Sequence, residues 1–100
     1  MSYNVISEAP GRLDWNQVLS IASELRGVVE VFPIPAESPE DPDALGLSIP
    51  SKRADERAWQ ELTRLIDSLK KRFEMKAVEL YSGLPFEPAT LERIRKNFLE

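Results

Sequence analysis

Residues Ala54 to Met75 read ADERAWQELTRLIDSLKKRFEM, and this stretch decides the fold of the chain. Apolar residues recur in it at steps of three and four: Ala58, Trp59, Leu62, Leu65, Ile66, Leu69 and Phe73. This spacing places them on one stripe of an α-helix, with charged and polar residues on the opposite side. The expected first turn is acidic and the last turn is basic, which complements the helix dipole. The pattern predicts a long amphipathic helix that packs its apolar stripe against the rest of the chain.

The composition is that of an ordinary globular domain. The chain has 100 residues, of which 42% are hydrophobic and 30% charged, and it contains no cysteine. This length is typical of one domain with its own core, so we expect residues 1–100 to form a single α+β domain. The lack of cysteine excludes disulfides and fits a reducing compartment. The sequence also lacks the pattern of a signal peptide and any apolar run of about 18 residues, so we expect a cytoplasmic protein.

The net charge of −4 bears on the choice of partner. Proteins that bind nucleic acids or anionic membranes usually present a basic excess, because phosphate contacts supply much of the affinity. Basic clusters do occur at residues 70–72 and 93–96, but both lie near expected helix ends, where basic residues complement the helix dipole. We therefore expect neither a nucleic-acid nor a membrane partner.

Two strands and one helix are expected before the central loop. Residues 3–7 form a first strand, and a helix follows over residues 15–26, with Asp14 as its N-terminal cap. Residues 28–34, VVEVFPI, are rich in β-branched and aromatic residues and predict a second strand. Pro33 and Pro35 cannot donate ladder hydrogen bonds, so this strand is expected at a sheet edge.

Two further strands and a last helix complete the pattern. Residues 45–49 alternate cleanly, residues 77–81 form a fourth strand, and Pro88 opens a final amphipathic helix with Leu91, Ile94 and Phe98 on one face. The resulting order β-α-β-β-α-β predicts a four-stranded antiparallel sheet in the order 4-1-3-2, with two helices on one face and a C-terminal helix added. This is the ferredoxin-like, or split βαβ, arrangement.

The sequence offers little side-chain chemistry for catalysis. Histidine and cysteine are both absent, which excludes the usual nucleophile pairs and the usual zinc or haem ligands. Glu30 and Glu79 are expected on strands at opposite edges of the sheet, too far apart for a carboxylate pair. No phosphate-binding glycine motif is present. We therefore expect a protein that is not an enzyme and that uses no metal or cofactor.

The loop over residues 35–44, PAESPEDPDA, is the most unusual local feature. Its acidic residues are Glu37, Glu40, Asp41 and Asp43. An EF-hand comparison fails, because Leu45 and Lys52 stand where oxygen ligands are required. The loop is then either a solvated, proline-stiffened connection or a docking element for a basic partner, because loops of this length are usually functional or disordered.

The sheet face away from the helices is the other candidate surface. We expect one face of the sheet to meet the helices through Leu45, Leu47, Ile49, Val78 and Leu80. The opposite face then carries Val28, Glu30, Phe32, Ala77, Glu79 and Tyr81. Its apolar members, Val28, Phe32 and Tyr81, suit an interface unless the C-terminal segment covers them.

The favoured function is a protein-interaction module that associates with itself or with another protein. The alternative is a regulatory domain that binds a metabolite at a dimer interface. For that alternative Arg12, just before the first helix, is the candidate anion ligand.

Overall fold

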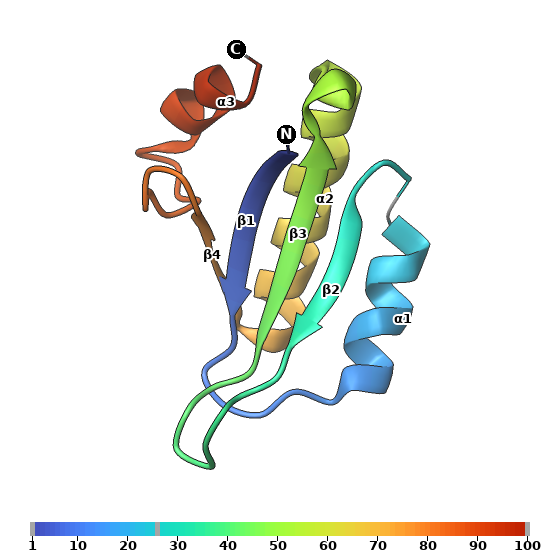
Figure 1. The fold of residues 1–100 in the computed structure, drawn as a ribbon, viewed down its shortest axis with the longest axis vertical. Coiled ribbons are helices and arrows are strands. Elements are labelled where there is room, and N and C mark those ends of the chain that lie inside the picture. Colours follow the sequence, from blue (N-terminus) through green and yellow to red (C-terminus); the bar gives the residue numbers. More distant parts are fainter. Residues whose placement is uncertain (1, 26, 100) are drawn as a thin grey trace.

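The computed structural model describes residues 2–25 and 27–99, and these form one antiparallel sheet with helices against it (Figure 1). The strands are β1 (Ser2–Glu8), β2 (Glu30–Ile34), β3 (Ala44–Pro50) and β4 (Lys76–Glu79). Their order is β2-β3-β1-β4, so β1 and β3 are central and both outer strands pair with a central one. The expected class, an α+β domain with an open antiparallel sheet, is confirmed.

The core lies between the sheet and two helices, α1 (Trp15–Leu25) and α2 (Glu56–Phe73). Leu45, Leu47 and Ile49 of β3 are fully buried against this helix layer, as the alternation predicted. The stripe of α2 is buried too, at Ala58, Trp59, Leu62, Leu65, Ile66 and Leu69. Figure 1 shows α2 lying along the sheet behind β1 and β3, which is where the long stripe meets the alternating strand.

The central helix is shorter at both ends than the sequence predicted. A 3₁₀ turn over Ser51–Arg53 precedes it, and the N-cap is Asp55, whose carboxylate accepts the Ala58 N–H at 2.8 Å. Ser51 begins the 3₁₀ turn and does not cap the helix. Glu74 ends the helix in the left-handed conformation at φ 57°. Asp67 and Lys71, four residues apart on the exposed side of the helix, form an ion pair with 3.0 Å between the charged atoms.

The first helix begins as predicted. The Asp14 carboxylate accepts the N–H groups of Asn16 and Gln17 at 3.1 and 3.4 Å, which satisfies donors that the first turn leaves free. Val18 and Ala22 are buried on the side that faces the core. Arg26, the expected last residue of the helix, lies outside the described residues.

Both edges of the sheet are protected against further strand pairing. At one edge, β2 contains Pro33, so its outer side lacks a donor there. At the other edge the chain turns sharply after Glu79 and runs back along β4. The Glu79 N–H donates to Leu84 at 2.9 Å, and the Phe86 N–H donates to Ala77 at 2.9 Å. This returning segment occupies the free side of β4.

The C-terminal helix α3 (Leu91–Leu99) joins the helix layer. It does not lie on the open face, which is the side of the sheet away from α1 and α2. Ile94 and Phe98 are buried, and the Phe98 ring lies 5.4 Å from the Trp59 ring of α2. Arg95 forms an ion pair with Glu56 in the first turn of α2. The predicted alternative in which this helix covers the open face is therefore wrong.

In the part of the chain described, no helix is long and apolar enough to cross a membrane.

The predicted phase of the fourth strand is wrong. The register pairs Glu79 with Val5 and Ala77 with Ser7, so Ala77 and Glu79 face the helices. Val78 pairs with Ile6 and lies on the open face. The sequence predicted that apolar Val78 and Leu80 face the helices. Instead Glu79 faces them and is completely buried, because three hydrogen-bond donors contact its carboxylate there. Buried polar groups are stable when they are hydrogen-bonded in this way.

Candidate functional site

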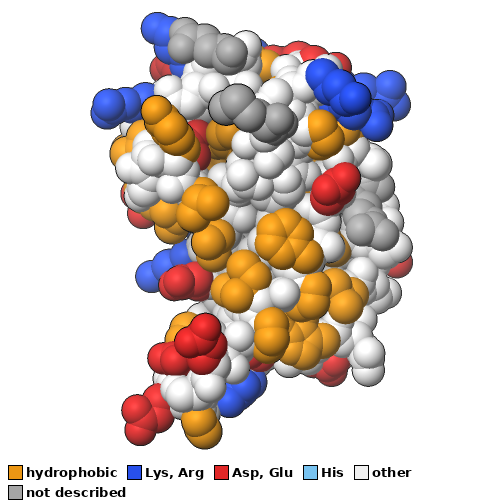
Figure 2. All heavy atoms as spheres, in the orientation of Figure 1, with side chains coloured by type: hydrophobic (Ala, Val, Ile, Leu, Met, Phe, Trp, Pro, Cys, Tyr) orange, Lys and Arg blue, Asp and Glu red, His pale blue; other side chains and the backbone are white. Residues whose placement is uncertain are grey.

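The open face of the sheet is organised in rows that cross all four strands. The middle row runs from Phe32 through Gly46 and Ile6 to Val78, each residue paired with the next. This row is apolar from one edge of the sheet to the other. In Figure 2, which looks onto this face, hydrophobic side chains gather over β1, β3 and β2.

Polar and charged residues occupy the rows on either side. One row contains Glu30, Ser48 and Asn4, and Leu80 follows beside Asn4 through a 3.1 Å backbone hydrogen bond. The other row contains Ile34, Ala44, Glu8 and Lys76. Acidic Glu30 and basic Lys76 therefore stand at diagonally opposite corners of the face. We call these three rows together the open face.

Phe32 is the exposed anchor of this surface. Its side chain is 47% exposed, and its ring lies over Gly46 so closely that a Cβ on Gly46 would overlap it. The glycine thus gives the ring a place against the backbone of the central strand. The prediction that Phe32 lies on the open face is confirmed by the register.

The two other apolar residues expected on this face lie elsewhere. Val28 precedes β2 and packs, half-buried, against the core, so its placement on the open face is wrong. Its N–H and that of Val29 donate to the Glu61 carboxylate of α2 at 2.7 and 2.9 Å. Tyr81 follows β4 in a turn and is 96% exposed at the margin of the sheet.

The acidic loop divides into an exposed tip and a buried base. Glu37, Glu40 and Asp41 are exposed, whereas Asp43 is only 2% exposed. The Asp43 carboxylate accepts the N–H groups of Leu13 at 2.8 Å and Ala36 at 3.0 Å. Asp43 therefore ties the loop to the segment before α1, and its expected role as a docking residue conflicts with this burial.

The contacts of Asp43 favour its charged form. Hydrogen bonds from the backbone of Leu13 and Ala36 lower the pKa of Asp43, burial opposes them, and the charge of Arg12 lowers the pKa further, so that it lies below its ordinary value. Arg12 lies 3.6 Å from this carboxylate and also donates to the Ser38 carbonyl at 3.4 Å. The predicted anion ligand Arg12 thus already has an acidic neighbour in this structure.

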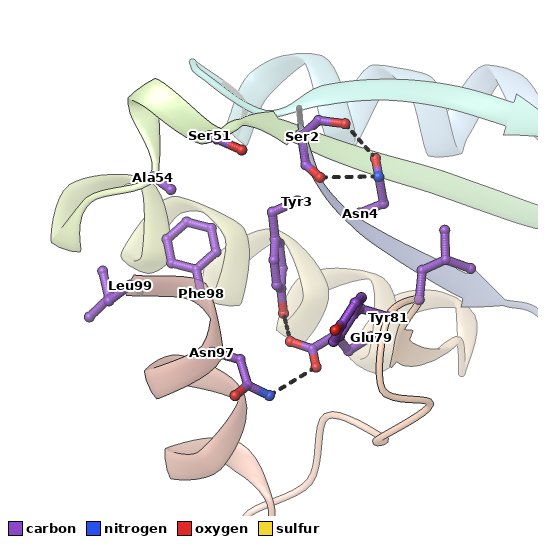
Figure 3. A pocket seen from close by; sticks show the side chains of 11 residues that line it. Ser2, Tyr3, Asn4, Ser51, Ala54, Glu79, Tyr81, Asn97, Phe98 and Leu99 are labelled. Carbon is purple, nitrogen blue, oxygen red and sulfur yellow. Dashed lines mark hydrogen bonds between the residues drawn. The ribbon is translucent and has the colours of Figure 1, made fainter.

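A second candidate site centres on Glu79. Its carboxylate accepts hydrogen bonds from the Tyr3 hydroxyl, the Ser82 hydroxyl and, at 3.2 Å, the Asn97 amide. Figure 3 shows the carboxyl group between Tyr3 of β1 and Asn97 of α3. Burial, the hydrogen bond to Glu79 and the negative charge of Glu79 together raise the pKa of the Tyr3 hydroxyl far above its ordinary value.

This network borders a pocket of about 610 Å³ between α3, the start of β1 and the turn after β4. The residues that line the pocket are Ser2, Tyr3, Asn4, Ser51, Ala54, Glu79, Leu80, Tyr81, Asn97, Phe98 and Leu99. Asn4 and Leu80 belong both to this lining and to the open face. The two candidate surfaces are therefore adjacent.

Metal binding has no support from side-chain positions. Among residues 2–25 and 27–99, no three Asp or Glu side chains lie close enough together to hold a metal ion. Glu30 and Glu79 are on outer strands at opposite edges and on opposite faces of the sheet, so they do not form a carboxylate pair.

Comparison with known proteins gives no family. No family model, curated protein or solved structure matches this chain.

Sequence reasoning missed Glu79 and Glu61 as organising residues. Both carboxylates collect donors from segments far away in the chain: Tyr3 lies 76 residues from Glu79, and Val28 lies 33 residues from Glu61. Partial burial raises the pKa of Glu61, but backbone hydrogen bonds from Gly27, Val29 and Val28 and the charge of Arg57 outweigh it and lower the pKa. For Glu79 the sequence offered one signal. The alternation of β1 places Tyr3, a hydrogen-bond donor to Glu79, on the same side of the sheet as the buried Val5.

Proposed function

We propose that this chain is a protein-interaction domain, without catalytic activity, that pairs with a second copy of itself through the open face. The observation that carries the proposal is the apolar row from Phe32 to Val78, which crosses the sheet with Phe32 47% exposed. Exposed apolar patches on small domains mark interaction surfaces more often than chance. The protected sheet edges favour pairing through the face over pairing through an edge strand.

The finer fold assignment supports a face-to-face arrangement. We propose the ferredoxin-like arrangement, because the element order and the neighbours β2-β3, β3-β1 and β1-β4 suit it and α1 and α2 occupy one face. Helices on one face only leave the other face of the sheet free to pack on a second sheet. The absence of cysteine supports a cytoplasmic location.

Charge placement supports a second copy as the occupant. Strands about 4.8 Å apart and residues about 3.3 Å apart make the open face nearly square, with sides of roughly 14 and 13 Å between its corner residues. A twofold axis along the diagonal from Ile34 to Leu80 exchanges the other two corners. Glu30 of each copy then faces Lys76 of the other, and the two sheets cross near a right angle, which is a known mode of sheet packing.

Charge reversal tests this dimer by sedimentation. Wild-type protein should form dimers at low ionic strength, where salt screens the corner pairs least. Glu30→Lys and Lys76→Glu should each weaken dimerisation about tenfold or more, because like charges then face each other, and the double variant should regain most of the affinity. Glu37→Lys makes the same charge change on the exposed loop and should leave dimerisation unchanged.

Two outcomes would overturn the proposal. A wild-type chain that stays monomeric across the accessible concentrations would exclude self-association. A dimer that survives both single reversals unchanged would place the interface elsewhere. Both charged residues are exposed, so these variants should keep the fold.

A second candidate function is the binding of a small regulatory ligand. The pocket beside Glu79 favours it, because the pocket shares Asn4 and Leu80 with the open face and would lie next to the dimer interface. Arg12, the anion ligand expected from sequence, does not suit this role, because its side chain already forms an ion pair with Asp43.

A further inference from the structure

The pocket between α3 and the turn after β4 has an unusual charge balance. Of the described residues that line it, Glu79 is the one carboxylate, and none is a lysine or an arginine. The donors that meet Glu79 are two hydroxyls and an amide, all of them neutral. Within the described residues Glu79 forms no ion pair. Among the described residues, dipoles alone stabilise this carboxylate, and Glu79 is the one acidic or basic side chain of the Asp, Glu, Lys and Arg types in the lining.

The end of α3 adds to this negative potential. Asn97, Phe98 and Leu99, the last residues of the helix, all line the pocket. The final carbonyl groups of a helix carry partial negative charge and attract cations. The helix end and the carboxylate thus both favour a cationic ligand.

Aromatic rings form the remaining part of the wall. Tyr3 and Phe98 meet edge to face with ring centroids 4.8 Å apart, and Tyr81 stands 96% exposed at the rim. Organic cations bind well against the faces of such rings, because the ring quadrupole attracts positive charge. A metal ion, by contrast, would need several oxygen ligands, and Glu79 supplies the only carboxylate among the lining residues that the structure describes.

We propose that this pocket binds a small organic molecule with a primary ammonium group, which donates to Glu79 in place of the Asn97 amide and stacks its alkyl part against Tyr81 and Phe98. The Asn97 side chain belongs to an exposed residue, and its bond to Glu79 is 3.2 Å long, so a rotation of Asn97 opens the carboxylate to the pocket (Figure 3). A charge-assisted hydrogen bond from an ammonium group is stronger than the neutral one it replaces. This site is separate from the proposed dimer contact at Glu30 and Lys76.

Nuclear magnetic resonance titration with n-butylammonium tests the proposal at constant ionic strength. The matched probes are 1-butanol, which has the same shape without charge, and butyrate, which has the opposite charge. Butylammonium should shift the amide signals of Tyr81 and Asn97 with a millimolar Kd, as suits a ligand of few atoms. The two other probes should bind at least tenfold more weakly, because each lacks the charge-assisted bond.

Two variants separate binding from folding. Glu79→Gln keeps the shape but removes the charge, and it should weaken butylammonium binding about tenfold or more. Tyr81→Ala changes an exposed side chain that folding does not need, and it should weaken binding about two- to fivefold, whereas Tyr81→Phe keeps the ring and should bind like wild type.

Equal shifts with 1-butanol and butylammonium would overturn the proposal, as would unchanged binding in folded Glu79→Gln or Tyr81→Ala protein. Failure of this site would leave the charge-reversal experiment on Glu30 and Lys76 unaffected, because none of those variants touches the pocket lining.

Discussion

At the scale of single residues, glycine and aromatic residues decide how the open face is built. Gly46 sits in a central strand, where glycine normally weakens a sheet because it offers no side chain to pack. Here the Phe32 ring from the neighbouring strand covers it. The cross-strand pair thus supplies the packing that the glycine lacks and holds an exposed ring on the proposed interface.

Gly46→Ala should destabilise the protein by about 1–3 kcal/mol, because the new methyl group overlaps the Phe32 ring and forces it aside. Urea denaturation followed by circular dichroism measures this loss. Gly11→Ala is the matched control, since a Cβ there meets nothing within 4 Å.

Gly46→Ala in a Phe32→Ala background shows whether the loss of stability comes from overlap with the Phe32 ring or from another cause. If the ring is the obstacle, Gly46→Ala should cost little once the ring is gone, and the two substitutions should be strongly coupled. An equal cost in both backgrounds would contradict this reading of the pair.

At the scale of elements, α2 contributes six of the 18 buried core residues described, more than any other helix or strand. Its 18 residues extend for about 27 Å at 1.5 Å per residue, and its apolar stripe is buried along its length. The helix also fastens two connections, since Glu61 holds the turn before β2 and Glu56 pairs with Arg95 of α3. One helix therefore couples the sheet, the turn before β2 and the C-terminal helix.

Leu62→Ala and Leu69→Ala should each lower the free energy of unfolding by about 2–5 kcal/mol, because both side chains are buried mid-stripe. Equilibrium unfolding in urea measures the loss. Arg64→Ala lies on the exposed side of the same helix and should change stability by less than about 0.5 kcal/mol. A loss below about 1 kcal/mol at both leucines would mean that the stripe does not carry the core.

At the scale of the whole molecule, buried carboxylates join segments that are far apart in sequence. Asp43 links the β2–β3 loop to the segment before α1, while Glu79 links β1, β4 and α3. These carboxylates act as centres to which backbone and side-chain donors converge. The link through Asp43 makes the stability of the fold sensitive to protonation, because the pKa of Asp43 is lowered in the folded protein.

Asp43 should contribute to loss of stability in acid. Its pKa is lowered in the folded protein, so its contribution is fully present above the ordinary carboxyl pKa of about 3.9 and is lost as the pH falls through the lower folded value. Asp43→Asn should therefore be less stable than wild type at pH 7, and the difference should shrink as the pH is lowered to about 2.

Urea unfolding at a series of pH values measures this difference. Asp41→Asn, at the exposed tip of the same loop, should follow the wild-type curve at every pH. A difference between Asp43→Asn and wild type that stays constant with pH would show that the charge of Asp43 does not stabilise the fold.

The sequence by itself determined the α+β class, the approximate position of each helix and strand, the buried stripe of α2 and the inward face of β3. These features follow from periodicity, because a stripe at steps of three and four or a strict alternation leaves one arrangement that removes apolar groups from water. Pro33 likewise predicted the edge position of β2, since proline cannot donate to a ladder.

Only the tertiary structure decided the face of β4, the burial of Asp43 and Glu79 and the course of the C-terminal helix. In a four-residue strand the apolar pattern is too short to fix the phase, and Glu79 turns inward because Tyr3, Ser82 and Asn97 offer it hydrogen bonds there. Those donors come from three separate segments. Tyr3 and Asn97 lie 76 and 18 residues from Glu79 in the sequence, so their meeting point depends on long-range packing, which local spacing does not encode.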